Sequence, residues 1–204
     1  ELAREALIEK VNSHDKLFKT LQRISWFGDM RLRYEIVDRA SDNSTANDAD
    51  GHLDTDRPRI RFRLGARAHV YKDLDFVFRL STGGDTATTS GNTTMDGTFG
   101  NEAISLNLAY GSWEIMNGLT VQGGKVKNPF MKSEVVWDND VNPEGLSEIY
   151  QKKSGDATLQ FVAGQYIVEE TDRNTTVDSD DVVLLAWQAQ LNQKTKAGKF
   201  KFAV

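Results

Sequence analysis

The sequence predicts an all-β fold, an antiparallel up-and-down transmembrane β-barrel that follows an N-terminal amphipathic helix. Three observations predict it. Hydrophobic and polar residues alternate along most of the chain, long and short connections alternate between these segments, and several segments are longer than the usual strands of a globular sheet. We assign residues 1–23 to the helix and residues 24–204 to about nine barrel strands.

The average composition of the 204-residue chain is that of a soluble acidic protein. It has 27% charged residues, a formal net charge of −5 and a mean hydropathy of −0.51. No window approaches the roughly 20 apolar residues of a membrane-spanning helix, so helical membrane proteins are excluded. The absence of Cys excludes disulfides, thiol catalysis and thiolate metal sites, and the acidic balance argues against a nucleic-acid partner.

The first segment, residues 1–23, has the period of an amphipathic helix. Apolar residues such as Ala3, Leu7, Leu17 and Leu21 recur among charged ones at helical spacing, and neither Pro nor Gly interrupts them. Two arrangements fit this pattern equally well. The helix either packs on a partner copy as a short coiled coil or lies alone against its own domain.

From residue 25 the hydrophobic period changes from 3.6 to 2, which is typical of β-strands. The first three candidate strands cover residues 26–36, 59–70 and 75–81. Their apolar residues lie mainly at even positions and their charged residues at odd positions, as where Phe62 lies between Arg61 and Arg63. Later candidates cover residues 104–115, 119–126, 146–152, 157–168, 182–192 and 199–204, and the pattern is weakest at 146–152.

The connections between these segments are long and short in turn. The long ones cover residues 38–56, 82–103, 128–145 and 169–181, and the short ones lie at 72–73, 117–118, 154–156 and 193–198. In an up-and-down sheet this order places all long loops at one end and all tight turns at the other. Outer-membrane barrels have this asymmetry, whereas a soluble sandwich has no need for it.

The charged face of the first strands must contact water. Desolvating isolated cations is very costly, so a row of arginines cannot lie in a dry core. The arginines could cover the outer surface of a soluble sandwich or line a water-filled lumen, and the loop order and strand length favour the lumen. Because lipid offers no hydrogen bonds to an open edge, such strands must close into a barrel.

Four segments carry a resemblance to a known family. They read GDMRLRYE at 28–35, DRPRIRFRLG at 56–65, GGKVKNPF at 123–130 and VWDNDVNPEG at 136–145. In this order and spacing they resemble a bacterial family described as putative porins.

The resemblance implies a bacterial outer-membrane barrel that passes small solutes, with a helical periplasmic segment before it and trimeric assembly. The partners it implies are outer-membrane lipid, small hydrophilic solutes or ions, and two further copies of the chain. Family members are longer than 204 residues, and this chain stops at Val204 within a candidate strand. We therefore expect a portion of a larger barrel that lacks C-terminal strands.

The alternation also predicts which side chains line the pore. If even positions of the first three strands face lipid, the charged odd positions face the lumen. The predicted pore-lining residues are Arg31, Arg33, Arg59, Arg61, Arg63, Arg67, Arg79, Asp29, Glu35, Asp75, Lys125 and Lys127. Cations at steps of roughly 6.6–7 Å would form a ladder for anions.

A loop folded into the lumen could oppose these cations with carboxylates and create a transverse field. The candidate is the connection 82–103, which is rich in Gly, Thr and Ser and contains Asp85, Asp96 and Glu102. A loop that remains outside the pore is an equally good interpretation.

Two later strands break the simple alternation. In 119–126, Lys125 and Lys127 would face lipid unless the register changes, at a cost of about 2–4 kcal/mol each near the midplane. We therefore predict a β-bulge at Gly123 and Gly124 that turns both lysines inward and Val126 outward. In 104–115 the apolar face switches before Trp113, and the sequence offers no account of this switch.

The function predicted from these patterns is a porin for passive diffusion, without enzymatic activity, metal or cofactor. The alternative is a structural or adhesive outer-membrane protein with a trimerising helix. An outer-membrane lipase would need Ser and His on the lipid-facing surface, but His69 lies on the arginine face. The acidic segment 48–54 only faintly resembles a calcium loop, since the full ligand series is absent.

Overall fold

The computed structural model describes residues 22–40, 52–84, 91–95, 99–132, 137–138, 140–170 and 181–204. Nearly all of the predicted N-terminal helix, 1–23, lies outside these residues, as does most of the acidic segment 48–54. Within the described ranges, no helix is both long enough and apolar enough to cross a membrane.

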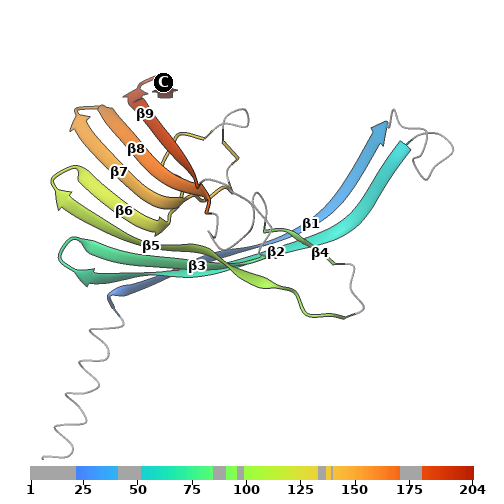
Figure 1. Ribbon diagram of the computed structural model, residues 1–204. Helices are drawn as coiled ribbons and strands as arrows, with labels where there is room; N and C mark the ends of the chain where they lie inside the picture. Colours follow the sequence, from blue (N-terminus) through green and yellow to red (C-terminus); the bar gives the residue numbers. More distant parts are fainter. Residues whose placement is uncertain are drawn as a thin grey trace, which may run out of the picture.

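The described residues form a single sheet of ten antiparallel strands (Figure 1). The strands are β1 (Ile24–Ala40), β2 (His52–Tyr71), β3 (Leu74–Thr82), β4 (Thr93–Thr94), β5 (Ile104–Met116), β6 (Leu119–Lys125), β7 (Glu144–Ser154), β8 (Ala157–Glu169), β9 (Val182–Thr195) and β10 (Gly198–Ala203). Apart from β4, which pairs with β2, neighbours in the sheet are neighbours in sequence. The predicted antiparallel up-and-down order is therefore confirmed. The sheet curves but is not closed into a barrel, because β1 and β10 do not pair.

The first hairpin is longer than the alternation predicts. Strands β1 and β2 stay in register from Ile24 opposite Ala68 to Ala40 opposite His52, so the two strands continue into the predicted loop 38–56. Figure 1 shows this end of the hairpin projecting beyond the other strands. A cross-strand ion pair of 2.8 Å between Arg57 and Glu35 stabilises the extension, although the apolar alternation has already weakened there.

The tight turns lie where the sequence predicts them. Two-residue turns occupy 72–73, 117–118, 155–156 and 196–197, and all lie along the same edge of the sheet in Figure 1. Gly118 has a φ of +81°, a conformation that favours glycine. Its N–H donates to a carboxylate oxygen of Glu114 at 3.1 Å. The long connections are at the opposite edge, as the predicted order requires.

The two faces of the sheet differ in character. One face, here called the inner face, carries a small apolar core together with residues of the connection that follows β6. The core consists of Val77, Leu108, Tyr110, Val126, Phe130, Val162 and Tyr166. The opposite, outer face exposes large apolar side chains such as Leu32, Trp113 and Trp187. The sheet therefore packs its inner face onto its own connection and leaves its apolar outer face uncovered.

A β-bulge explains the switch of apolar face in β5. Leu80 pairs with Leu106 and Arg79 pairs with Leu108, so Asn107 is an extra residue between the two pairs. Leu106 consequently faces outward, as does Trp113, while Leu108 is buried on the inner face. The Asn107 side chain accepts a hydrogen bond of 2.7 Å from Nε of Arg79.

The bulge predicted at Gly123 and Gly124 is wrong. Strand β6 pairs with β5 and with β7 without a register change at either glycine. Val126 does not turn outward but is completely buried in the inner core. The lysines need no bulge, because Lys125 ends the strand and its ammonium contacts Glu144, while Lys127 follows in the connection.

Candidate functional site

A polar cavity of about 920 Å³ lies on the inner face and is lined mainly by cationic side chains. We call it the basic cavity. Its lining residues are Arg31, Arg33, Arg61, Arg63, Arg79, Lys127, Lys132, Trp137, Asp138, Asp140 and Asn142. The arginines come from β1, β2 and β3, and the other residues come from the connection between β6 and β7.

The register of the first hairpin places cations opposite one another. Arg31 pairs with Arg61, and Arg33 pairs with Arg59. Because residues in register share a face, all four guanidinium groups lie on the inner face. Like charges directly opposite one another destabilise a sheet, so this arrangement needs carboxylates nearby.

Two carboxylates of β1 supply this compensation. Asp29 accepts from Nη2 of Arg61 at 3.0 Å and from Nε of Arg63 at 2.7 Å. Glu35 contacts Nε of Arg57 at 2.8 Å and Nη1 of Arg59 at 3.2 Å. These ion pairs set the positions of the guanidinium groups.

A third carboxylate reaches the arginines from the connection between β6 and β7. Oxygens of Asp140 lie 3.6 Å from Nη1 of Arg61 and 3.3 Å from Nη1 of Arg63. The connection 82–103 is one candidate for an inward-folded loop, with a loop outside the pore as an equally good interpretation, and Asp140 is not among the predicted residues. The acidic motif 136–145 is the signal that could have indicated it.

The connection between β3 and β5 also contributes to the inner face. The Asn92 side-chain oxygen accepts from Nε of Arg31 at 3.1 Å, and its backbone carbonyl accepts from Nη2 of Arg59 at 2.8 Å. Strand β4 follows and pairs with β2 at Arg59 and Ile60. Part of the predicted loop 82–103 therefore lies against the arginines, although Asp85 and Asp96 fall outside the described residues.

Aromatic contacts hold the connection between β6 and β7 in place. The rings of Phe130 and Trp137 are stacked, with centroids 5.9 Å apart and an interplanar angle of 11°. Phe130 also meets Tyr166 edge-on at 6.2 Å. The Met131 N–H donates to the side-chain oxygen of Gln188 at 2.6 Å. These contacts attach the connection to β8 and β9, which are distant in the strand order from the arginine-bearing β1 and β2.

Burial strengthens the electrostatic effect of the charges that line the basic cavity. The side chains of Arg61 and Arg63 are only 11% and 17% exposed, so water screens them less than surface arginines. Nε of Arg61 is buried and has no hydrogen-bond acceptor among the described residues. Burial, reinforced by the charge of Lys127, lowers the pKa of Lys132 from its ordinary value of 10.5.

The structure brings together six of the twelve predicted pore-lining residues at this cavity, namely Arg31, Arg33, Arg61, Arg63, Arg79 and Lys127. Asp29, Glu35 and Arg59 contact this set through the bonds given above. Arg67 and Asp75 form a pair of 3.7 Å near the tight turn, where Nδ1 of His69 lies 2.8 Å from Asp75. The prediction that Lys125 lines the pore is wrong, because Lys125 lies on the outer face of β6 together with Leu119 and Val121.

The residues that sequence reasoning missed, Asn92, Lys132, Trp137 and Asp140, all lie in connections. No periodic pattern marks such residues, because their positions depend on how the connection folds. Among the described residues, no group of three His, Cys, Asp or Glu is placed to hold a metal ion.

A family model described as "putative porin" matches residues 47–204, which is most of the chain. The chain belongs to the putative porin family. A search of curated proteins finds no match. The matched residues include β2 to β10, and therefore the arginines of β2 and β3 and both connections that contact them; we call the inner-face arginines of β1, β2 and β3 the arginine wall.

Proposed function

We propose that this porin-family chain forms part of a closed outer-membrane β-barrel and lines a water-filled channel for passive diffusion of small hydrophilic solutes, with a preference for anions. The main observation in support of the proposal is that the two faces of the sheet differ in polarity. The inner face holds the basic cavity, and the outer face exposes large apolar side chains. Further strands must pair with β1 and β10, because lipid would leave those edges without hydrogen bonds.

The outer face has the composition expected for contact with lipid. Trp187 is 81% exposed, Leu32 is 67% exposed and Phe202 is 65% exposed. Large apolar patches are rare on soluble monomers, whereas the lipid-facing band of an outer-membrane barrel consists of such residues. Outer-membrane lipid is therefore the partner that this face fits best.

The charge of the inner face supports an anion preference. Seven cationic side chains and two carboxylates line the basic cavity. An anion that enters exchanges part of its hydration for guanidinium and ammonium donors, while a cation meets a positive potential. Asp140 reduces this potential locally and directs part of the field across the cavity.

Electrophysiology on the full-length protein tests this function. In a planar bilayer under a salt gradient, we expect channel steps and a reversal potential of the sign that marks anion preference. Replacing both Arg61 and Arg63 with Ala should reduce that preference. Arg67→Ala is the matched control, since Arg67 does not line the cavity. Absence of channel steps, or a clear cation preference, would contradict the proposal.

The trimer implied by the family resemblance remains a prediction, as does a periplasmic position for residues 1–23. Cross-linking of the full-length protein in outer membranes, followed by electrophoresis, would test the trimer. A monomer under conditions that cross-link neighbouring proteins would contradict the trimer.

A further inference from the structure

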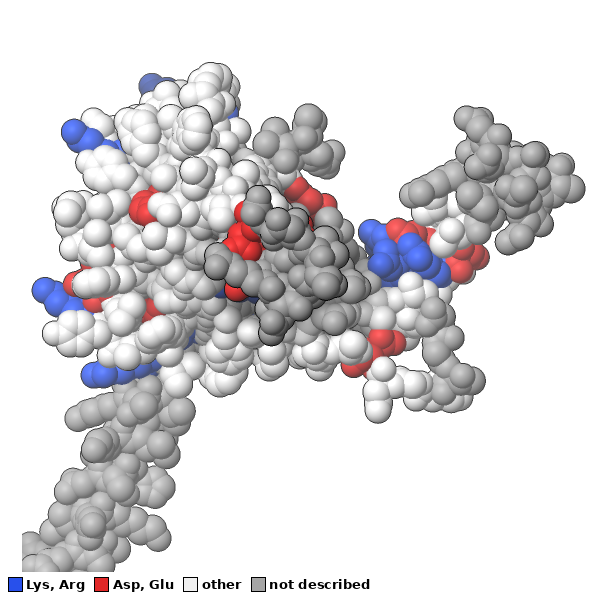
Figure 2. All heavy atoms as spheres, in the orientation of Figure 1, with Lys and Arg blue, Asp and Glu red and all other residues white. Residues whose placement is uncertain are grey.

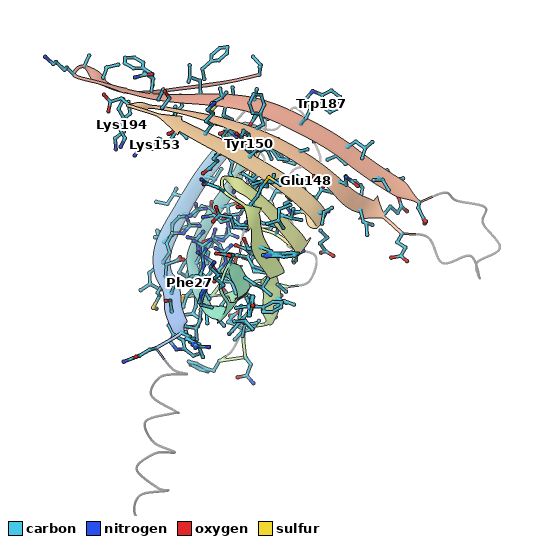
Figure 3. The ribbon with its side chains drawn as sticks, turned by 90° about the vertical axis from the view of Figure 1, so that its left-hand side faces the viewer. Phe27, Glu148, Tyr150, Lys153, Trp187 and Lys194 are labelled. Carbon is cyan, nitrogen blue, oxygen red and sulfur yellow. The ribbon has the colours of Figure 1, made fainter. Side chains whose placement is uncertain are left out.

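A second group of cations lies on the inner face, far along the chain from the arginines. It consists of Lys153, Lys194, Lys199 and Lys201, which we call the lysine cluster. These residues lie at the ends of β7, β9 and β10 next to the tight turns 155–156 and 196–197. Figure 3 shows Lys153 and Lys194 on one side of the sheet and Trp187 on the other, and Figure 2 shows separate cations along the tight-turn edge as well as a group of charges on the projecting end of the first hairpin.

The sheet register places these lysines on one face. Lys153 pairs with Thr158, Thr158 with Asn192, and Asn192 with Lys201. Four strands thus carry a row of inner-face side chains that spans about 14 Å, or three strand spacings. The two ends of the row are cationic, and the hydroxyl and amide between them can donate hydrogen bonds.

Lys194 and Lys199 form the adjacent row. They pair directly across β9 and β10, so their Cα atoms are separated by roughly 4.5–5.5 Å. Like charges at this distance repel unless an anion lies between them. None of the four lysines forms an ion pair with a described residue.

A concave surface accompanies the charges. A cavity of about 350 Å³ is lined by Gln151, Asp156, Thr158, Gln160, Asn192, Gln193, Lys194, Lys199, Phe200 and Lys201. Asp156 is the one acidic residue in this lining, and its backbone carbonyl accepts from the N–H of Lys194. The cavity therefore combines three lysines with several neutral hydrogen-bond donors.

Protection of a sheet edge from unwanted strand pairing does not account for all of these lysines. Lysines on an edge strand can prevent unwanted pairing, and β10 is the edge of this sheet. Lys153, however, lies three strands from that edge, and the outer-face positions of β10 hold Phe200 and Phe202. Four of the lysines in this region, from β7, β9 and β10, share the inner face, and this grouping indicates a ligand instead.

We propose that the lysine cluster is a second anion-binding site, at the tight-turn mouth of the channel, and that it binds small multivalent oxyanions such as pyrophosphate. The site rests on the proposed porin function. A monovalent anion contacts one or two of the ammonium groups, whereas a multivalent oxyanion spans several and gains a charge-assisted hydrogen bond from each. The site takes up such anions at one mouth, and the basic cavity receives them from there.

The experiment is a block of chloride current by pyrophosphate in a bilayer of zwitterionic phosphatidylcholine, which supplies no anionic headgroup. The chain has no Cys, so Ala197→Cys in the tight turn allows thiol labelling to identify the side of the membrane that this turn faces. Pyrophosphate added on that side should block at a lower concentration than pyrophosphate added on the other. Replacing Lys199 and Lys201 with Gln should raise the half-blocking concentration about tenfold on that side alone.

Two variants serve as controls. Lys152→Gln removes one positive charge from the same region, but Lys152 pairs with Leu159 on the outer face, so this variant should leave the block unchanged. Replacing Arg61 and Arg63 with Ala should lower anion preference while the side dependence of the block persists. An equal block from both sides, or a block unaffected by Lys199→Gln and Lys201→Gln, would overturn the site while leaving the porin function intact.

Binding is measured independently of conduction. Calorimetric titration of the detergent-solubilised full-length protein with pyrophosphate should show a site that is lost when Lys199 and Lys201 are replaced with Gln and retained in Lys152→Gln. If no channel steps appear, the porin function fails and this titration still decides the site. Absence of binding by the unmodified protein would overturn it.

Discussion

The carboxylate of Asp140 lies 3.3 Å from Nη1 of Arg63, although the two residues are 77 positions apart in sequence. Nε of the same arginine is 2.7 Å from Asp29, its neighbour across the first hairpin. Arg63 is therefore held between a carboxylate of the sheet and a carboxylate of a connection. This arrangement both attaches the connection to the arginine wall and neutralises part of the wall's charge.

Replacing Asp140 with Asn should increase anion preference. The substitution removes one of two carboxylates that line the basic cavity and keeps the size of the side chain. We expect the anion-to-cation permeability ratio to rise on the order of twofold in dilute salt and less at high salt, where screening is stronger. Reversal potentials under a KCl gradient measure it. Glu169→Gln, an exposed carboxylate at the end of β8, is the control, and an equal shift in both variants would assign the effect to net charge.

The strands were predictable because each has a local signal. Period-2 alternation identifies β3, β5 and β8 to within one or two residues of their ends. Two of the tight turns contain a glycine at positive φ, Gly118 and Gly155. β1 and β2 run further than predicted because pairing with a partner strand, not local alternation, sustains their outer ends.

The site was only partly predictable because half of it comes from connections. Arg61 and Arg63 follow from alternation, whereas Asp140 and Trp137 reach the cavity only through tertiary contacts such as the stack with Phe130. The prediction of a β-bulge at Gly123 and Gly124 was wrong for a similar reason. The cost of lysines in lipid is a local criterion, but the burial of Val126 and the end of β6 at Lys125 decide the local structure.

Gly164→Ala should destabilise the sheet. A Cβ at this position would lie 2.4–2.5 Å from ring atoms of Tyr166, which is 1% exposed. The ring cannot easily move, because its hydroxyl is 2.9 Å from that of Ser147. We expect a loss of about 1–3 kcal/mol, as for other overpacked sites.

Urea unfolding in lipid vesicles, followed by tryptophan fluorescence, measures the loss at Gly164. Gly84→Ala is the control because a Cβ at Gly84 would have no atom within 4 Å. Equal midpoints for the two variants would show that Tyr166 does not occupy the space over Gly164.

Deleting Asn107 should leave the fold intact. Asn107 is the extra residue of the bulge, so its removal makes the pairing of β5 with β3 regular while Leu106 stays outward and Leu108 stays inward. Deleting Ala109 instead should shift the later residues of β5 by one position and turn Tyr110 outward. Heat-modifiable migration on electrophoresis reports folding, and we expect it for the Asn107 deletion alone. Failure of the Asn107 deletion to fold would show that the bulge itself is required.

Lys132 should make the anion preference depend on pH in the alkaline range. Its pKa is lowered by burial and by Lys127, so it loses its charge at a pH below 10.5. As the pH rises through that lowered pKa, anion preference should fall. In the same window the unfolded chain binds more protons than the folded one, so stability should rise with pH.

Reversal potentials measured from neutral pH up to the ordinary lysine pKa of 10.5 test the role of Lys132. Lys132→Arg keeps its charge throughout and should abolish the early fall. Lys132→Gln should have the lower preference already at neutral pH. If the three proteins follow one profile, Lys132 does not contribute to the field of the cavity.

Phe130→Ala should release the connection between β6 and β7 from the inner face. Phe130 is 5% exposed and contacts both Trp137 and Tyr166, so its truncation leaves a cavity at the point where the connection meets the strands. We expect a loss of about 3–5 kcal/mol in unfolding free energy.

Because Asp140 lies on the same connection, its ion pair with Arg63 should weaken in Phe130→Ala, and single-channel current should fluctuate between levels. Phe202→Ala removes a ring of the same size from the exposed outer face and should leave the current steady. Steady single-channel current in Phe130→Ala would mean that the ion pairs of Asp140 alone position the connection.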